Sequence, residues 1–283
     1  MRSHILLAAL LASGTAILAQ ETPSADPIFD DREIEAKLVQ ALEAIQEAKP
    51  EDTLDAYLKA GADASFQYTL APPAEVRLEP TAVHERMARA TLVLGLRYKC
   101  SHCTRWHVGP SSAFLIASEG VIATSYHVVE KGGGALAAMD VAGRTWPVQG
   151  VVALDQASDL ALLRIAPPAD LVPLPIATEL PRAGEDVFVL SHPAAHFFVY
   201  TRGIASRLSR GRQDRFEALE ITAPYARGSS GAPVVDARGN VVGVVKATRS
   251  IYYEEHAGGE SENLQMVIQM TVPASKLRTL ALR

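Results

Sequence analysis

The sequence predicts a mainly β protein flanked by helices, and three observations support this fold class. From Ala90 onward, short β-rich runs alternate with turn residues, which is typical of a β-barrel or β-sandwich. Residues 30–60 instead place apolar residues at helical spacing, and residues 273–280 predict a closing helix with proline in its first turn. With 283 residues, 48% of them hydrophobic, the chain can form one large domain with an appendage or two small barrels.

Residues 1–19 have the layout of a secretory signal peptide. An apolar run from Ile5 to Ala19 follows a basic start, and small residues lie near its end. A membrane anchor is the alternative, but the run has 15 residues, whereas a membrane-spanning helix needs about 20. We therefore expect cleavage near Ala19, no stable membrane insertion afterwards, and a mature chain in the periplasm or outside the cell.

Residues 20–88 are expected to form an acidic helical extension. Residues 20–80 hold 14 acidic and 5 basic residues, an excess typical of a solvated face. Asp30 and Asp31 can cap a helix whose apolar stripe packs on the rest of the protein, with an oligomerisation face as the alternative. The stripe consists of Ile34, Leu38, Leu42 and Ile45. A second short helix is expected over residues 52–60.

Residues 89–283 are expected to form the β domain. The predicted strands are Thr91–Arg97, Ala113–Ile116, Val121–Thr124, Thr145–Ala153, Leu160–Ile165, Asp186–Leu190, Phe198–Leu208, Phe216–Ala223, Val234–Val235, Val241–Lys246 and Leu264–Val272. The proline-rich stretch 166–184 divides them into two groups, so it is the expected crossing between two barrels. No basic patch interleaves with aromatic residues, so nucleic-acid binding is not expected.

Three candidate catalytic residues, His127, Asp159 and Ser230, occur in that order with gaps of 32 and 71 residues. Chymotrypsin-like peptidases have the order His, Asp, Ser, whereas α/β-hydrolases have Ser, Asp, His and subtilisins Asp, His, Ser. The expected crossing places His127 and Asp159 before it and Ser230 after it. We therefore expect the site in the cleft between the two barrels.

The sequence around each candidate resembles the trypsin-like peptidases of the bacterial HtrA type. Residues 112–129, SAFLIASEGVIATSYHVV, resemble the family's "GSGF…G.I.TN.HVV". Residues 158–165, SDLALLRI, resemble "(S/T)D(I/L)A(L/V)L(K/R)(I/V)", and residues 228–235, GSSGAPVV, resemble "GNSGGPL(V/L)". The resemblance covers roughly the last two thirds of the chain.

This resemblance implies two six-stranded antiparallel β-barrels of the chymotrypsin type. It also implies an endopeptidase that acts on polypeptide substrates through an acyl-enzyme, with the backbone amides of Gly228 and Ser230 as its oxyanion hole. Many HtrA proteins carry PDZ domains after the peptidase. None is expected here, because the sequence ends after the closing helix.

The three residue types meet the requirements of acyl transfer. A serine hydroxyl is a weak nucleophile at neutral pH, so an imidazole must take its proton and later give it to the leaving group. His127 is assigned this role. A buried carboxylate holds the imidazole in the correct tautomer and stabilises the imidazolium, which is the role assigned to Asp159. No cofactor and no metal are needed for this chemistry, and none is expected.

Two residues near Ser230 bear on this prediction. Ala232 stands where the family has a second glycine, which requires backbone angles that suit a residue with a Cβ. Pro224, six residues before Ser230, stands where trypsin has an acid, so a preference for Lys or Arg at P1 is not expected. The opposite pocket wall is expected at residues 246–248. A non-catalytic peptide-binding module, acting as chaperone or adaptor, and an esterase on the same fold are the alternative functions.

Cys100 and Cys103 are the only cysteines and form one Cys-x-x-Cys motif. In a secreted chain, a local disulfide between them is the leading interpretation. A zinc site that recruits His102 and His107 is an alternative. Haem attachment is not expected, because the residue after the second cysteine is Thr104. A thioredoxin-like redox pair is not expected either, because such a pair begins a helix and this one follows a strand.

Overall fold

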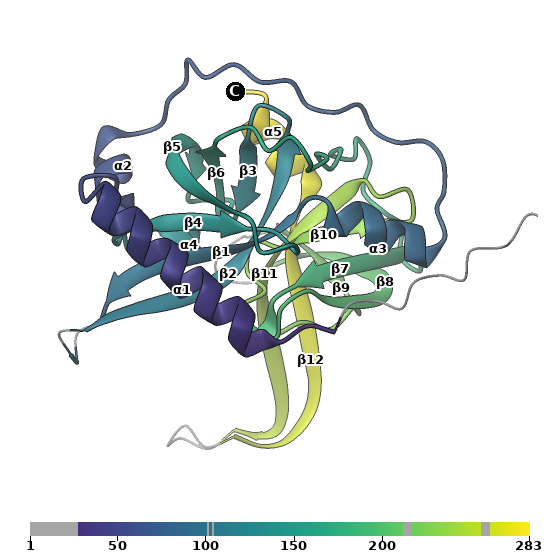
Figure 1. Ribbon diagram of the computed structural model, residues 1–283. Helices are drawn as coiled ribbons and strands as arrows, with labels where there is room; N and C mark the ends of the chain where they lie inside the picture. The colour runs from purple at the N-terminus through teal and green to yellow at the C-terminus, as the bar shows by residue number, and fades with distance from the viewer. Residues whose placement is uncertain (1–27, 101, 104, 212–216, 256–260) are drawn as a thin grey trace, which may run out of the picture.

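The computed structural model describes residues 28–283, except residues 101, 104, 212–216 and 256–260. The strands form two closed six-stranded antiparallel barrels (Figure 1). A connection after residue 165 leads from the first barrel to the second, and helices precede and follow the barrels in the chain. The predicted mainly β, chymotrypsin-like fold class is confirmed. The predicted signal peptide, residues 1–19, lies outside the described residues.

The first barrel has the strand order β1-β2-β3-β6-β5-β4. Its strands are β1 (Thr91–Lys99), β2 (Trp106–Ala117), β3 (Val121–Thr124), β4 (Leu136–Met139), β5 (Thr145–Asp155) and β6 (Leu160–Ile165). All except β4 were predicted. The segment Leu-Ala-Ala-Met has weak β propensity because alanine presents little side chain for packing. It is a strand because it pairs with both β1 and β5 and because all four side chains are buried.

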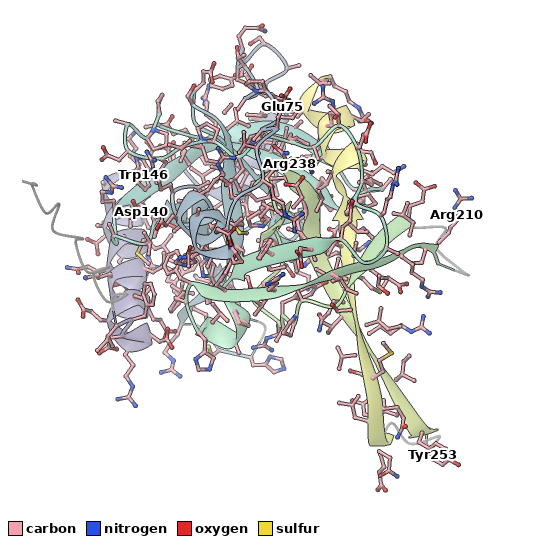
Figure 2. All side chains as sticks on the ribbon, turned by 90° about the vertical axis from the view of Figure 1, so that its right-hand side faces the viewer. Glu75, Asp140, Trp146, Arg210, Arg238 and Tyr253 are labelled. Atoms are coloured by element: carbon pink, nitrogen blue, oxygen red, sulfur yellow. The ribbon has the colours of Figure 1, made fainter. Side chains whose placement is uncertain are left out.

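The second barrel has the order β10-β11-β12-β9-β8-β7. Its strands are β7 (Asp186–Ser191), β8 (Val199–Arg210), β9 (Glu217–Ile221), β10 (Pro233–Asp236), β11 (Val241–Glu255) and β12 (Ser261–Pro273). The sequence predicted all six, but it predicted the end of β11 at Lys246, far short of Glu255, whereas the prediction of residues 264–272 covers most of β12. Beyond the barrel these two strands continue as a projecting hairpin, with Tyr253 near its end (Figures 1 and 2). Exposed strands of this kind lack the buried apolar alternation that the prediction uses.

Helix α1 (Asp31–Ala48) packs on the first barrel. Asp30 caps it, since its side chain accepts hydrogen bonds from the backbone N–H groups of residues 32 and 33. Leu38 and Leu42 of the predicted stripe are fully buried. The side chain of Leu38 lies over Gly95 of β1, where a Cβ would come within 2.7 Å of it. The stripe therefore faces the protein's own barrel.

Within the described residues, four further α-helices and one short 3-10 helix, η1 (Pro193–Ala195), complete the fold. The α-helices are α2 (Leu54–Ala60), α3 (Pro80–Ala88), α4 (Tyr126–Val129) and α5 (Ala274–Ala281). The sequence analysis predicted α2 and α5 but neither α3, which begins with Pro80, nor the single turn α4. Helix α4 has only four residues, and α3 buries only Val83 and Met87, so neither carries a long periodic signal. In the part of the chain that the structure describes, no helix is both long enough and apolar enough to span a lipid bilayer.

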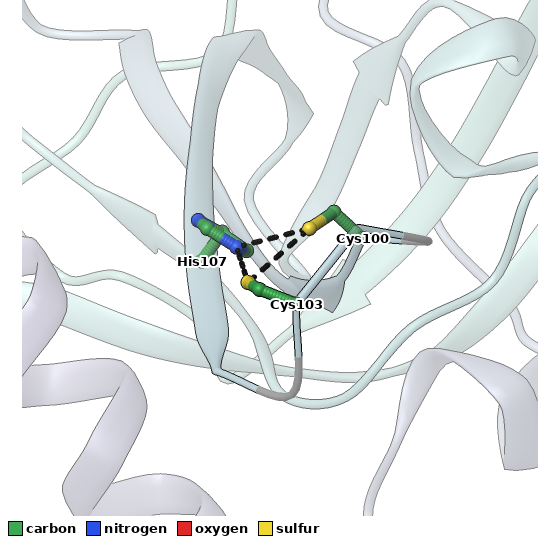
Figure 3. Close-up of side chains that lie close together, drawn as sticks. All are labelled: Cys100, Cys103 and His107. Atoms are coloured by element: carbon green, nitrogen blue, oxygen red, sulfur yellow. Dashed lines mark hydrogen bonds between the residues drawn. The ribbon is translucent and has the colours of Figure 1, made fainter.

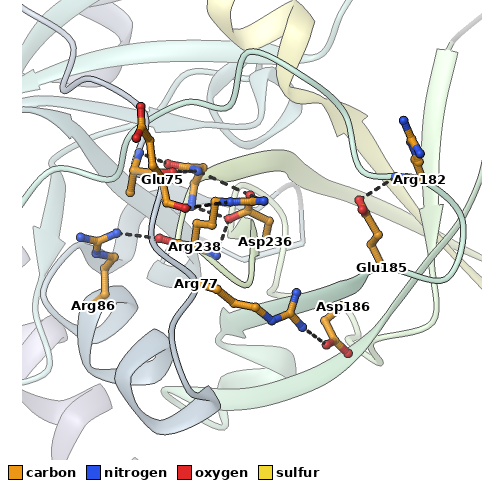
Figure 4. Close-up of polar contacts among 10 residues, drawn as sticks. Glu75, Arg77, Arg86, Arg182, Glu185, Asp186, Asp236 and Arg238 are labelled. Atoms are coloured by element: carbon orange, nitrogen blue, oxygen red, sulfur yellow. Dashed lines mark hydrogen bonds and ion pairs between the residues drawn. The ribbon is translucent and has the colours of Figure 1, made fainter.

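The segment between α2 and α3 runs along both barrels and is fastened to the second one. Asn240 holds it most directly, because its amide donates to the carbonyl of Ala74 at 2.9 Å and its carbonyl oxygen accepts the Ala74 N–H at 2.7 Å. Further along, Arg77 pairs with Asp186 at 2.8 Å (Figure 4). The extension thus reaches the outside of both barrels.

Candidate active site

His127 and Asp159 lie side by side because they flank paired strands. His127 is on α4, directly after β3, and Asp159 directly precedes β6, the strand that pairs with β3. The Asp159 carboxylate is 2.9 Å (Oδ2) and 3.0 Å (Oδ1) from His127 Nδ1, and Oδ1 also accepts the backbone N–H of His127 at 2.9 Å. This pairing places the ring proton on Nδ1 and leaves Nε2 free to accept a proton.

The surroundings of this pair differ from one partner to the other. The Asp159 side chain is 9% exposed, whereas the His127 side chain is 40% exposed. The aspartate also has a left-handed backbone, with φ of 58°, which aspartate tolerates better than most residues. A buried carboxylate beneath an accessible imidazole can stabilise positive charge on the ring while Nε2 stays within reach of a substrate.

Ser230 lies in the tight turn before β10, between two glycines that have positive φ. Gly228 has φ of 98° and Gly231 has φ of 85°. A Cβ on Gly231 would lie 2.2 Å from the carbonyl oxygen of Ser112, so no other residue fits there. Ala232, which replaces the family's second glycine, is fully buried and does not have positive φ. Alanine is therefore compatible with the turn.

The turn abuts the segment that carries His127. The carbonyl oxygen of Val245 on β11 accepts both the Ser125 hydroxyl, at 3.1 Å, and the Gly231 N–H, at 2.9 Å. Ser125 is two residues before His127, and Gly231 follows Ser230 directly. One carbonyl group therefore ties together the two segments that hold the predicted base and the predicted nucleophile.

The structure does not join Ser230 to His127 by a hydrogen bond. The Ser230 hydroxyl donates to the carbonyl oxygen of Lys246 instead, over a long 3.4 Å. Among the described residues, the sequence-predicted candidates thus form one hydrogen-bonded pair, His127 with Asp159, and a serine on the neighbouring turn.

The backbone amides of the turn fall into two groups. Those of Ser229, Gly231 and Ala232 donate to carbonyl oxygens of residues 226, 245 and 229. Those of Gly228 and Ser230 have no acceptor among the described residues. Unpaired N–H groups this close together are suited to binding a negatively charged oxygen.

A pocket of about 210 Å³ opens beside Ser230. Its lining consists of Tyr225, Ala226, Arg227, Ser230, Val245, Lys246, Ala247 and Thr248, none of which is acidic. The predicted wall, residues 246–248, is among them. Tyr225 was not singled out from the sequence. Its buried hydroxyl contacts the carbonyl oxygens of Ala247 (3.1 Å) and Met270 (2.7 Å), and burial raises its pKa, so it stays uncharged.

The loop that supports the serine turn contains a buried histidine, His192. Its Nδ1 accepts the Phe198 N–H at 3.1 Å, and its carbonyl oxygen lies where a Cβ on Gly228 would clash. Burial lowers the pKa of His192 to about 4, so the ring is neutral at pH 7. Ala194 and Ala195 of the same loop have φ of 51° and 62°, and the Ala194 N–H donates to the carbonyl of Arg227.

The predicted disulfide between Cys100 and Cys103 is not present. The two sulfurs lie 3.4 Å apart, whereas a disulfide bond is about 2.05 Å long, and both thiols are free. The His107 ring nitrogen Nε2 lies close to both sulfurs. The sequence analysis considered His107 only for the alternative zinc site and not for the disulfide. His102 does not join the group.

Comparisons with known proteins find similarity over the central part of the chain. Residues 111–244 match the profile of the trypsin-like peptidase domain. The chain is 31% identical over 151 residues to the chloroplastic protease Do-like 1 of Arabidopsis thaliana, and 31% identical over 155 residues to the mitochondrial serine protease HTRA2 of Bos taurus. It is also 34% identical over 139 residues to the uncharacterised protein y4bJ of Sinorhizobium fredii.

These similarities cover about half of this chain and a smaller share of each relative. The matched regions span 50%, 52% and 47% of this chain, and 34%, 33% and 21% of the three relatives in the same order. The chain thus matches about a third or less of the length of each of these three relatives. The comparisons support a function of the serine protease type for the matched region.

Proposed function

Because the chain carries a trypsin-like peptidase domain related to the HtrA peptidases, we propose that it is a serine endopeptidase that cleaves polypeptides with His127, Asp159 and Ser230. The observation that supports this most is the His127–Asp159 pair beside the serine turn. Among the described residues, His127 Nε2 and the amides of residues 228 and 230 have no hydrogen-bond partner. A chain that only bound peptides would not need a polarised imidazole at this point.

In the proposed reaction, the Ser230 hydroxyl first rotates from the Lys246 carbonyl toward His127. Its oxygen attacks the carbonyl carbon of the scissile bond while its proton passes to Nε2 of His127. The C–N bond then breaks as His127 returns this proton to the leaving amine, and the acyl group remains as an ester on Ser230. Water, activated by His127 in the same way, hydrolyses the ester and regenerates the serine.

The amides of Gly228 and Ser230 are proposed to stabilise the tetrahedral intermediate. Negative charge develops on the former carbonyl oxygen as Ser230 attacks, and each preorganised donor contributes about 2.7 to 4 kcal/mol to its stabilisation. The loop of His192 packs against Gly228, and its Ala194 N–H donates to the carbonyl of Arg227. The donors are therefore fixed before the substrate binds.

A fluorophosphonate probe tests the proposal directly, because it reacts only with an activated serine. We expect labelling at Ser230 that is abolished in Ser230→Ala and strongly reduced in His127→Ala. Ser229→Ala is the matched control, since the Ser229 hydroxyl is buried without a partner among the described residues and plays no part in the reaction. With a peptide substrate, Ser230→Ala should lose on the order of 10⁶ in kcat. A loss of only a few-fold would contradict the assignment.

The pocket beside Ser230 is proposed to bind the P1 side chain of the substrate. Its lining has no acid to pair with Lys or Arg, and the hydroxyl of Tyr225 is taken by backbone carbonyls. A Lys or Arg side chain would therefore pay a desolvation cost there that no carboxylate of the lining offsets. The proposed substrates are cleaved after residues other than Lys and Arg.

The site of action is proposed to be the periplasm or the extracellular space, with residues 1–19 as a cleaved signal peptide. The apolar run of residues 5–19 in the sequence supports this proposal. Fusion of residues 1–27 to a reporter that is active only after export should give an active reporter and a new N-terminus near residue 20. An inactive reporter would contradict it.

One observation favours a second candidate, a catalytically weak peptide-binding module. The Ser230 hydroxyl donates to the carbonyl of Lys246 and not to His127. If this is the functional conformation, peptides should bind in the cleft with no probe labelling and no turnover. Labelling at Ser230 would exclude this candidate.

A further inference from the structure

The turn between β1 and β2 gathers two cysteines and a histidine from opposite sides of one hairpin. Cys100 follows the last residue of β1, Cys103 lies in the turn, and His107 is the second residue of β2. The strand register pairs His107 with Tyr98, two residues before Cys100. His107 Nε2 lies 3.3 Å from Cys100 Sγ and 3.0 Å from Cys103 Sγ, and the sulfurs are 3.4 Å apart (Figure 3).

These distances fit three ligands of one metal ion. The three atoms lie on a circle of about 1.9 Å radius, so an ion about 1.3 Å above their plane would be about 2.3 Å from each, close to zinc–sulfur and zinc–nitrogen bond lengths. The triangle is slightly smaller than that of three ligands in a tetrahedral zinc site. Two sulfurs and an imidazole are also the donor set that zinc prefers over magnesium or calcium.

We propose that Cys100, Cys103 and His107 bind one zinc ion, with both cysteines as thiolates, and that this ion holds the β1–β2 turn closed. All three side chains are partly exposed, so an ion can enter and water can occupy the fourth position. Within the described residues these are the only His, Cys, Asp and Glu side chains grouped closely enough to share an ion. The site is separate from the proposed catalytic residues and needs none of them.

The position of the turn indicates what the ion would stabilise. Arg97 of β1 forms two backbone hydrogen bonds with the loop that follows α4. Its N–H donates to the carbonyl of Ala135 at 2.9 Å, and its carbonyl accepts the N–H of Gly134 at 2.7 Å. A Cβ on Gly134 would contact the ring of Trp106, the first residue of β2. Closing the turn therefore supports the loop directly after the helix that carries His127.

Metal binding to the reduced full-length protein tests the site without reference to peptidase activity. After treatment with a chelator and reductant, the wild type should bind one Zn²⁺ per chain, with protection of both thiols from a thiol reagent. Co²⁺ should give the absorption bands of a tetrahedral thiolate site. His107→Ala and Cys103→Ser should weaken Zn²⁺ binding by more than about 100-fold, because each removes a direct ligand.

The neighbouring His102 provides the matched control. His102→Ala removes a histidine from the same turn but none of the three grouped atoms, so it should leave Zn²⁺ affinity within about threefold of wild type. Wild-type protein that binds no Zn²⁺ and gives no Co²⁺ bands would overturn the proposal. A second result would also overturn it. Protein isolated without reductant would be lighter than the reduced protein by two hydrogen atoms, as a disulfide requires, and would still bind no Zn²⁺ after reduction.

Discussion

Asp159 determines both the position and the tautomer of His127. Its carboxylate binds the ring Nδ1 and the backbone N–H of the same residue, so one side chain fixes the helix turn and the tautomer together. The sequence predicted all three candidate residues, because each lies in a short motif beside an apolar strand. It did not predict that the serine hydroxyl donates to the carbonyl of Lys246, because a sequence pattern does not specify the rotamer of a side chain.

Asp159→Asn should therefore lower kcat for a peptide substrate by about 10⁴-fold while the protein remains folded. An amide that donates toward Nδ1 favours the tautomer with its proton on Nε2, which cannot accept the serine proton. Asp155→Asn is the matched control, since Asp155 lies in the same turn but does not contact His127. Among the described residues its carboxylate accepts the Ser158 N–H and pairs with Arg283. A loss below tenfold in Asp159→Asn, with the control unchanged, would remove Asp159 from the mechanism.

His192 makes the fold sensitive to acid. Burial lowers its pKa to about 4 in the folded protein, whereas the unfolded chain has an ordinary value near 6.5. The unfolded state therefore takes up a proton first as the pH falls. Stability is lost between about pH 6.5 and pH 4, and this residue causes no further loss below pH 4.

His192→Gln should remove this component of the pH dependence. Between pH 7 and pH 5, the free energy of unfolding of the wild type should fall by about 2 kcal/mol more than that of the variant. Urea titrations of both proteins at the two pH values measure the difference, and each protein serves as its own reference at pH 7. Parallel losses in the two proteins would show that His192 is not protonated on unfolding in this range.

At the scale of elements, α1 illustrates how a local sequence pattern becomes tertiary structure. Its apolar stripe was readable from spacing alone, but the surface that receives it was not. Gly95 in β1 leaves the space that the Leu38 side chain fills. A glycine in a strand weakens the strand unless another group approaches closely, and here the group is this leucine.

Leu38→Ala should lower the free energy of unfolding by about 2 to 5 kcal/mol, because it empties a fully buried site against the barrel. Glu35→Ala, on the exposed side of the same helix, should change it by no more than about 0.5 kcal/mol. Denaturant unfolding followed by circular dichroism gives both values. Equal stabilities of the two variants would mean that α1 is not part of the cooperative fold.

The elements that sequence reasoning missed share a physical cause. Half of β4 is alanine, α4 is a single turn, α3 buries only two side chains, and the outer part of β11 is largely exposed. Each is stabilised by pairing or packing with distant segments and not by its own periodicity. The elements with a regular apolar pattern, such as β6 and α1, were predicted within a few residues.

At the scale of the whole molecule, the two barrels divide the proposed work. The first supplies His127 and Asp159, and the second supplies Ser230, the unpaired amides and the pocket. The carbonyl of Val245 joins the two through Ser125 and Gly231. The proposed catalysis therefore depends on how the barrels meet, whereas the proposed choice of P1 residue depends on the second barrel alone.

This division predicts that specificity can be changed without altering the catalytic pair. The wild type should cleave peptides with Ala, Val or Leu at P1 at least about tenfold more efficiently than those with Lys or Arg, measured as kcat/KM across a peptide library. Thr248→Asp places a carboxylate on the pocket wall and should raise kcat/KM for Lys and Arg relative to Leu. Thr248→Asn, of the same size but uncharged, should not. If both variants had the same profile, or if the wild type already preferred basic residues, the pocket beside Ser230 would not be the one that reads P1.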